Sequence, residues 1–360
     1  MDLKELGWND FFEKHFNEIK TADIQPARVT TSQREIYCIY GEFGELRAEL
    51  AGKLRFDASS LSELPVVGDW VTVRMDRGHG LAIIEGILPR ISKLSRKTTG
   101  KTTEEQVLVA NIDIIFLVNG LDGDYNLRRI ERYLTVAMES NTKSVILLNK
   151  TDVCPDSQVK IAEVEAVSSG TPVCALSAMK NEGIEKLNEY IIKGRTVAFI
   201  GSSGAGKSTI INCLLGEERQ KVGAVREYDD RGKHITTHRE LIILPGGGIV
   251  IDNPGLREIQ LWADEPALKD AFTDIDTFAL NCKFGDCAHA EEPECAVRGA
   301  IENGSLDPKR FQGYLKLQKE LRYLATRKEK VKAHNAKIVT EKRISKAIKQ
   351  IKKHNNKYQF

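Results

Sequence analysis

The sequence predicts an α/β fold, in which a doubly wound, mostly parallel sheet follows a small β-barrel and precedes a helical segment with potential metal ligands. Three observations support this prediction. Short apolar runs alternate with helical patterns from residue 112 to residue 252, as in a sheet covered by helices on both faces. An apolar run at 197–200 leads directly into a glycine-rich loop. Before residue 90, short β-rich pieces alternate with glycine-containing turns, the pattern of a five-stranded barrel.

The composition indicates a soluble globular protein of two or three domains. The 360 residues are 41% hydrophobic and 29% charged, and this length is enough for a sizeable core. No apolar run approaches the ~20 residues of a membrane span, and the N-terminus lacks the basic-then-apolar order of a signal peptide. We therefore expect a cytoplasmic protein that has no membrane partner.

The N-terminal extension, residues 1–27, is expected to carry one amphipathic helix over 3–20, because its apolar residues recur at three- and four-residue spacings. An OB-like barrel is predicted over 28–90. Such barrels often bind single-stranded or looped RNA, but the fold alone does not establish that function, and a purely structural barrel is the alternative. Its strands are expected at 27–30, 35–40, 46–50, 70–74 and 81–84.

The α/β domain is predicted over residues 104–262, after a polar, basic connector at 91–103. Two apolar runs near its end flank a Pro-Gly-Gly-Gly turn and predict a hairpin. Strands are expected at 112–118, 144–148, 172–176, 240–244 and 248–252, and helices at 127–140, 157–168 and 182–192.

The glycine-rich loop has the form Gly-x-x-x-x-Gly-Lys-Ser, which is typical of phosphate-binding loops. Between a strand and a helix, successive backbone amides and the helix N-terminus can face one anion. Lys207 is the expected catalytic residue that stabilises phosphate charge, and Ser208 is expected to bind Mg²⁺ through its hydroxyl oxygen. The residues expected to cradle the nucleotide are Gly201, Ser202, Ser203, Gly204, Ala205, Gly206, Lys207, Ser208 and Thr209.

A second motif, Asn149-Lys150-Thr-Asp152, follows a strand and has the form with which GTPases recognise guanine. The aspartate can accept from the N1 and N2 hydrogens of guanine, whereas adenine offers no matching pair of donors. Ser177 and Ala178, after the next strand, resemble the loop that supports the base. In one sheet with a phosphate loop, the motif predicts binding of GTP and GDP.

A third motif, Asp252-x-x-Gly255, ends another strand and matches the switch that senses the γ-phosphate. Asp252 is expected to hold Mg²⁺ through water, and the Gly255 amide to contact the γ-phosphate. A polar segment at 232–238 is suited to a first switch. Either Thr236 or Thr237 is its candidate Mg²⁺ ligand, and the sequence does not choose between them.

The order of these motifs is permuted. In an ordinary GTPase the phosphate loop comes first and the guanine motif near the end, but here Asn149 precedes Gly201 and Asp252. The sequence therefore predicts a circularly permuted P-loop GTPase domain. Its second switch runs into the C-terminal region, so nucleotide state is expected to influence the domain that follows.

A helical zinc-binding domain is predicted over residues 263–326. Four potential ligands lie close together there, namely Cys282, Cys287, His289 and Cys295. Three thiolates and an imidazole form a closed tetrahedral set for one structural Zn²⁺. The dispersed cysteines Cys38, Cys154, Cys174 and Cys213 are expected to be small core residues.

The C-terminal tail, residues 327–360, is strongly basic. It has twelve Lys or Arg and two acidic residues, so it carries about +10 while the net charge of the whole chain is +2. The tail is the candidate RNA-contacting element. A solvated helix face or a disordered terminus is the alternative.

This succession of barrel, permuted GTPase and Cys-Cys-His-Cys site resembles the RsgA (YjeQ) family of ribosome small subunit-dependent GTPases over nearly the whole chain. The stretches 232–237, 252–258 and 282–297 carry the resemblance most closely. It implies a GTPase that binds the 30S subunit late in maturation and contacts 16S rRNA near the decoding region. It also implies that the subunit stimulates hydrolysis and that the protein leaves after it.

Two positions bear on catalysis. Ile235 stands first in what is usually a run of three threonines in the family, which is why the Mg²⁺ threonine stays open. Leu256 follows the switch glycine where Ras-like enzymes carry a water-orienting glutamine. By similarity to the family, His234 is the candidate that positions the water, and an exposed loop histidine without a catalytic role is the alternative.

The expected activity is Mg²⁺-dependent GTP hydrolysis by a monomer, accelerated by the small subunit. An RNA-binding assembly scaffold with incidental turnover is a second hypothesis, and a permuted GTPase acting on the large subunit is a third.

Overall fold

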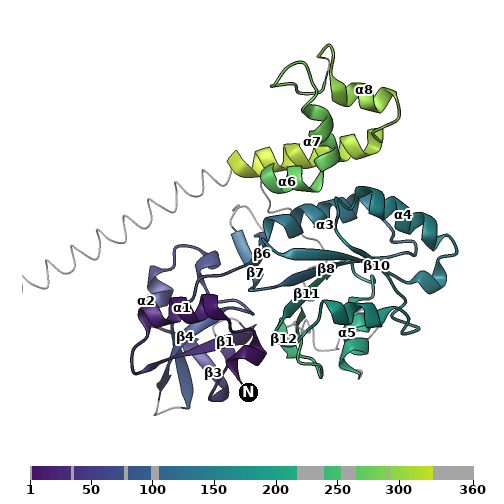
Figure 1. The fold of residues 1–360 in the computed structure, drawn as a ribbon. Helices are drawn as coiled ribbons and strands as arrows, with labels where there is room; N and C mark the ends of the chain where they lie inside the picture. Colours follow the sequence, from purple (N-terminus) through teal and green to yellow (C-terminus); the bar gives the residue numbers. More distant parts are fainter. Residues whose placement is uncertain are drawn as a thin grey trace, which may run out of the picture.

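The computed structural model describes residues 2–33, 36–76, 80–98, 105–216, 239–252, 265–290 and 292–326. In these ranges the chain forms a barrel, then a sheet with helices on both faces, then a helical C-terminal part (Figure 1). None of the helices described has the length and apolarity needed to span a bilayer. The predicted α/β architecture with an N-terminal barrel is confirmed.

Two short helices, rather than the single predicted one, begin the chain. The 3₁₀ helix η1 (Leu3–Leu6) ends at Gly7, whose left-handed backbone (φ 88°) lets its amide bond the carbonyls of the preceding turn. The helix α1 (Asp10–Ile19) begins after Asn9, whose side chain accepts from two amides of the first turn. Because both helices pack into one core around Trp70, the apolar spacing continues across the break and hides it.

The five predicted barrel strands are present. They are β1 (Ile24–Gln33), β2 (Ile36–Gly41), β3 (Gly44–Leu50), β4 (Trp70–Asp76) and β5 (Leu81–Ile87), with α2 (Gly52–Asp57) and η2 (Leu61–Glu63) between β3 and β4. The barrel closes because β1 pairs with both β2 and β4, while β3 and β5 pair in parallel. Val29, Ile39, Val71 and Ile84 are completely buried inside it. Strand β1 begins before the predicted start at residue 27.

The prediction of a connector without secondary structure at 91–103 is wrong in part, because Lys93–Lys97 form strand β6. This strand pairs antiparallel with β7 (Glu105–Ala110) in a separate two-stranded sheet. Its sequence signal is weak: Leu94 is completely buried, but the next residue, Ser95, bonds a polar side chain of β7. A strand stabilised by polar cross-strand pairs does not show the apolar alternation on which the prediction relied.

The central sheet has the strand order β10-β9-β8-β11-β13-β12, in which all strands except β12 are parallel. Its elements are β8 (Ile114–Gly120), α3 (Leu127–Glu139), β9 (Lys143–Asn149), η3 (Thr151–Val153), α4 (Ser157–Val167), β10 (Val173–Ala175), η4 (Ile184–Glu189), β11 (Thr196–Gly201), α5 (Lys207–Leu215), β12 (Glu240–Ile243) and β13 (Ile249–Asp252). Helices α3 and α4 cover one face and α5 the other (Figure 1). On β8, Leu117 enters the core under α3 and Phe116 the core under α5. The helix expected at 182–192 is the shorter 3₁₀ helix η4, which begins after Gly183 in the left-handed region (φ 78°).

The barrel joins the central sheet where β1 pairs antiparallel with β12, with Thr31 opposite Glu240. Nearby, Arg28 is 1% exposed. Burial lowers the pKa of Arg28 to about 10, which leaves it cationic at neutral pH. Its guanidinium donates to three carbonyls from separate segments, those of Leu6, Gly68 and Asn111. One side chain thus ties the N-terminal helices, the barrel and the segment before β8 together.

The C-terminal part consists of α6 (Glu265–Ala271), α7 (Thr273–Ala279), α8 (Ala296–Glu302) and a helix over 308–326. It lies on the α3 side of the sheet (Figure 1). Apolar residues of this C-terminal part share one buried core with α3, among them Leu268, Phe272 and Leu321. The predicted helical segment is therefore present and packs directly on the central domain.

Candidate functional site

The predicted phosphate loop connects β11 to α5 at the carboxyl edge of the parallel strands. Gly201 ends β11 where no side chain fits, since an added Cβ would lie 2.3 Å from the carbonyl oxygen of Val118. Gly206 is left-handed (φ 98°), and a Cβ there would lie 2.1 Å from the side-chain nitrogen of Asn149. Close packing requires both glycines, and the backbone angle also requires the second.

Lys207 turns its ammonium group back over this loop. Its Nζ donates to the carbonyl oxygens of Gly201 and Ser202, at 2.7 Å each. The loop tip at 203–204 is exposed, whereas Ala205 is completely buried. A positive charge therefore lies beside a loop of backbone amides at a helix N-terminus, which is the chemistry of a phosphate site.

Asn149 joins the two predicted nucleotide motifs. Its side chain is almost completely buried, and its Nδ2 donates to the carbonyl of Ala205 in the phosphate loop at 2.9 Å. Its Oδ1 accepts from the amide of Ala178 at 3.0 Å. One buried amide thus holds the guanine motif, the phosphate loop and the base-supporting loop at one edge of the sheet.

The other members of the guanine motif lie at the same edge. Lys150 is left-handed (φ 68°), and its ammonium pairs with the Asp122 carboxylate at 2.6 Å. Burial opposes ionisation of Asp122, but the hydrogen bond from Lys150 and nearby amides hold its pKa below the ordinary value. The Asp152 carboxylate accepts from the Ser177 hydroxyl at 2.5 Å, which orients it.

The predicted magnesium ligands are described in part. Ser208 and Thr209 lie in the first turn of α5. Asp252 is the last residue of β13, which runs parallel to β11, so it lies at the same edge as the phosphate loop. Four predicted site residues fall outside the described residues, namely His234, Thr236, Thr237 and Gly255.

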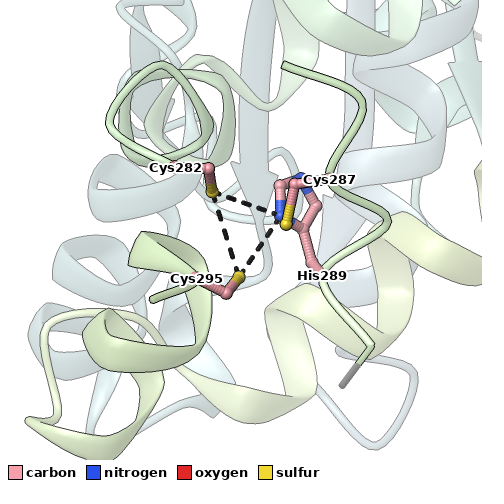
Figure 2. Close-up of side chains that lie close together, drawn as sticks. All are labelled: Cys282, Cys287, His289 and Cys295. Carbon is pink, nitrogen blue, oxygen red and sulfur yellow. Dashed lines mark hydrogen bonds between the residues drawn. The ribbon is translucent and has the colours of Figure 1, made fainter. Parts of the chain in front are cut away.

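The four predicted zinc ligands come together in the C-terminal part (Figure 2). The ligand atoms of Cys282, Cys287, His289 and Cys295 all lie within 4.8 Å of one another. His289 Nδ1 is 3.6 Å from the sulfur of Cys282 and 3.5 Å from that of Cys295. These separations fit a tetrahedral Zn²⁺, whose bonds to sulfur and nitrogen are about 2.0–2.3 Å long.

The surroundings of this cluster act differently on its thiols, since burial and the neighbouring thiols raise the pKa of Cys287 to about 11. Burial opposes ionisation of Cys282, but backbone amides at the start of α8 bond its sulfur, and the pKa of the thiol is lowered. Glu292 accepts from the amides on both sides of His289, at 2.9 and 2.8 Å, and so fixes the loop that carries the imidazole. The remaining cysteines are free thiols, buried at Cys154 and partly buried at Cys38, Cys174 and Cys213.

Comparison with known sequences identifies the family. The sequence model of the RsgA GTPase family matches residues 87–262. A protein of Opitutus terrae, named small ribosomal subunit biogenesis GTPase RsgA, is 45% identical over 342 residues, which cover 92% of this chain and 93% of the relative. The chain belongs to the RsgA GTPase family. It is therefore a GTP hydrolase. A protein of the same name from Syntrophotalea carbinolica is 45% identical over 329 residues, 89% of this chain and 90% of the relative.

Solved structures share this RsgA GTPase fold. YjeQ from Thermotoga maritima is 28% identical with a TM-score of 0.62, covering 83% of this chain and 98% of that chain. YloQ, described as a circularly permuted GTPase, is 20% identical with a TM-score of 0.57, covering 84% and 96%. The permuted GTPase fold predicted from the motif order is confirmed.

In this RsgA family member, an ion-pair network joins the C-terminal helices to α3. The Arg310 side chain is 5% exposed and donates to Asp274 on α7 at 2.6 Å and to Glu131 on α3 at 2.7 Å. Glu131 is itself only 1% exposed, and the guanidinium lies over the Phe272 ring, 4.6 Å from its centroid. The C-terminal helices are thus attached to the GTPase domain by charge as well as by apolar packing.

Sequence reasoning missed the loop between β8 and α3. Besides Asp122, it carries Asp124, whose carboxylate accepts from the Ser202 hydroxyl and pairs with Arg129 at 2.9 Å. A signal was available, because acidic residues that directly follow a buried strand parallel to β11 must lie at the phosphate-loop edge.

Proposed function

We propose that this GTP hydrolase acts in biogenesis of the small ribosomal subunit. In this proposal the 30S subunit binds the GTP form and stimulates hydrolysis to GDP and phosphate, and hydrolysis releases the protein. Relatives that match most of the chain are named small ribosomal subunit biogenesis GTPase RsgA, which supports this partner. The observation that carries the nucleotide site is the Asn149 bridge, because it unites phosphate and base recognition.

The phosphate half of the site supplies the catalytic electrostatics. Lys207 and the loop amides at 201–209 stabilise charge on the phosphates, where preorganised donors lower the barrier to phosphoryl transfer. Ser208 and Asp252 hold Mg²⁺, together with Thr236 or Thr237, and this ion neutralises charge on the phosphate oxygens when bound. The roles of Ser208 and Asp252 are supported by their position at the edge where the phosphate loop begins.

The base half of the site supplies specificity. Asp152 accepts from the N1 and N2 hydrogens of guanine, and its bond from Ser177 supports the required orientation. Lys150 and Ala178 border the base. In the switch segments, the Gly255 amide contacts the γ-phosphate and His234 positions the attacking water, two roles that rest on the family resemblance.

The remaining parts serve structure and binding. The Cys282 cluster holds one structural Zn²⁺, which stabilises the C-terminal helices. The barrel and the basic tail at 327–360 contact 16S rRNA through its phosphate backbone. We propose that the protein works as a monomer in the cytoplasm.

Variants that lose GTP hydrolysis separate this proposal from a scaffold role. Cells in which the only copy of the gene for this protein carries Lys207→Ala or Ser208→Ala are expected to accumulate immature small subunits. The variant protein is expected to sediment with these subunits. Precursor 16S rRNA and subunit profiles measure the outcome. Normal maturation with hydrolysis abolished would favour the scaffold, and sedimentation with the 50S subunit would favour the third hypothesis.

A further inference from the structure

The phosphate loop donates a hydrogen bond to a residue of the loop between β8 and α3, which belongs to none of the nucleotide motifs. We infer that Asp124 is a positioning residue for the phosphate loop and acts by accepting a hydrogen bond from Ser202. The inference rests on the proposed nucleotide site and names a further residue on which its phosphate half depends.

Ser202 makes hydrogen bonds through both its side chain and its main chain. The hydroxyl donates to Oδ2 of Asp124, and the carbonyl accepts from the Lys207 ammonium at 2.7 Å. Ser202 is 8% exposed, so water competes little for these bonds. A shift of Ser202 therefore moves an acceptor of Lys207 along with the amides of the loop.

Asp124 is itself fixed by the start of α3. Arg129 Nη1 donates to Oδ1 of Asp124 at 3.0 Å, and Nη2 pairs with Oδ2 at 2.9 Å, a fork that sets the plane of the carboxylate. The Asn126 side chain accepts from the Arg129 amide at 3.1 Å and so fixes the first turn of the helix. The guanidinium also offsets a carboxylate charge that would otherwise repel bound phosphates.

The same loop reaches the base half of the site. Asp122 pairs with Lys150 at 2.6 Å, and its Oδ1 accepts from the Asp124 amide at 3.3 Å. The packing is tight, because a Cβ on Gly120 would lie 2.6 Å from that Oδ1. The loop therefore braces both recognition motifs, with Asp122 on the base side and Asp124 on the phosphate side.

A purely structural role for Asp124 makes a different prediction. Its side chain is 36% exposed, and partly exposed ion pairs contribute little to stability. A surface pair would therefore leave nucleotide kinetics at the wild-type level, whereas a positioning residue changes kcat while the fold stays intact.

A double-mutant cycle on the full chain tests the link between Asp124 and Ser202. GTP turnover is measured for Asp124→Ala, Ser202→Ala and the double variant, with the thermal unfolding midpoint as the check on folding. Each single change is expected to lower kcat roughly tenfold, the scale of one charge-assisted hydrogen bond. The kcat of the double variant is expected to be no lower than that of the less active single variant, because both changes remove the same bond.

Three further variants sharpen the test. Asp124→Asn keeps the shape and an acceptor oxygen and should recover most of kcat. If Asp124→Ala unfolds, Ser202→Ala carries the test, because it removes the same hydrogen bond and should still lower kcat. Asp122→Ala should raise KM for GTP with a smaller effect on kcat, since its partner is Lys150. Glu165→Ala removes an exposed carboxylate from α4 and should leave both constants unchanged.

Two results would overturn the inference: wild-type kcat in Asp124→Ala, or losses that multiply to about a hundredfold in the double variant. Failure of the nucleotide site itself would look different. In that case Lys207→Ala would hydrolyse GTP at the wild-type rate, whatever the Asp124 variants do.

Discussion

The side-chain amide of Asn149 donates to the carbonyl of Ala205 at 2.9 Å, across 56 positions of the chain. In sequence the guanine motif comes before the phosphate loop. In space, β9 and β11 flank β8 in a parallel sheet, so both loops leave the same edge. The permutation thus changes the order of the motifs along the chain, while in space they still lie side by side at one edge of the sheet.

Removing this bond is expected to damage nucleotide binding. In Asn149→Ala the carbonyl of Ala205 and the amide of Ala178 lose their partner, and we expect the affinity for GDP to fall at least about tenfold. Titration calorimetry with GDP measures the change. Asn17→Ala removes an exposed amide from α1 and should leave the affinity unaltered. Wild-type affinity in Asn149→Ala would mean that the two motifs do not need this bridge.

The buried ion pair between Arg310 and Glu131 is expected to matter for stability. Arg310→Met removes the bonds to Asp274 and to Glu131, which is 1% exposed and keeps Arg128 as a partner. The change should lower the free energy of unfolding by about 3 kcal/mol, the low end of the range for breaking a buried pair. Arg132→Met is the matched control, because Arg132 and Glu320 are 29% and 33% exposed and such pairs contribute at most about 1 kcal/mol. Urea unfolding compares them. Equal losses in the two variants would contradict the burial argument.

The Cys-Cys-His-Cys cluster is expected to bind about one zinc per chain. Cys287→Ser removes one of its thiolates and should lower the zinc content measured by mass spectrometry, along with the helix content of the C-terminal part. A chelator should act in the same way on the unmodified chain. Cys38→Ser, on β2 in the barrel, should keep both values. Wild-type protein that is fully folded without metal would disprove the site.

The basic tail is expected to contribute to binding of the small subunit. A chain that ends at residue 326 loses about ten positive charges, so its affinity for 30S subunits should fall and its dependence on salt should flatten, as phosphate contacts are lost. Filter binding over a range of salt concentrations measures both. If the shortened chain matched the full chain at every salt concentration, the tail would have no such role.

Much of the fold and of the site could be predicted because the relevant signals are local. The strand that ends at Gly201 and the helix that starts at Lys207 are recognisable from neighbouring residues alone. Contacts between distant segments have no such signal: the Asp124 bond to Ser202 spans 78 positions, and the Arg310 bond to Glu131 spans 179. Strand β6 was missed for another reason, since polar cross-strand bonds replace the apolar alternation.

Phosphate release from GTP and from ATP, with and without purified 30S and 50S subunits, tests the central claim most directly. We predict slow hydrolysis of GTP alone, no hydrolysis of ATP, and strong stimulation by 30S but not by 50S subunits. GTP-specific hydrolysis that neither subunit changes would leave the nucleotide site intact and contradict the proposed role in small-subunit biogenesis.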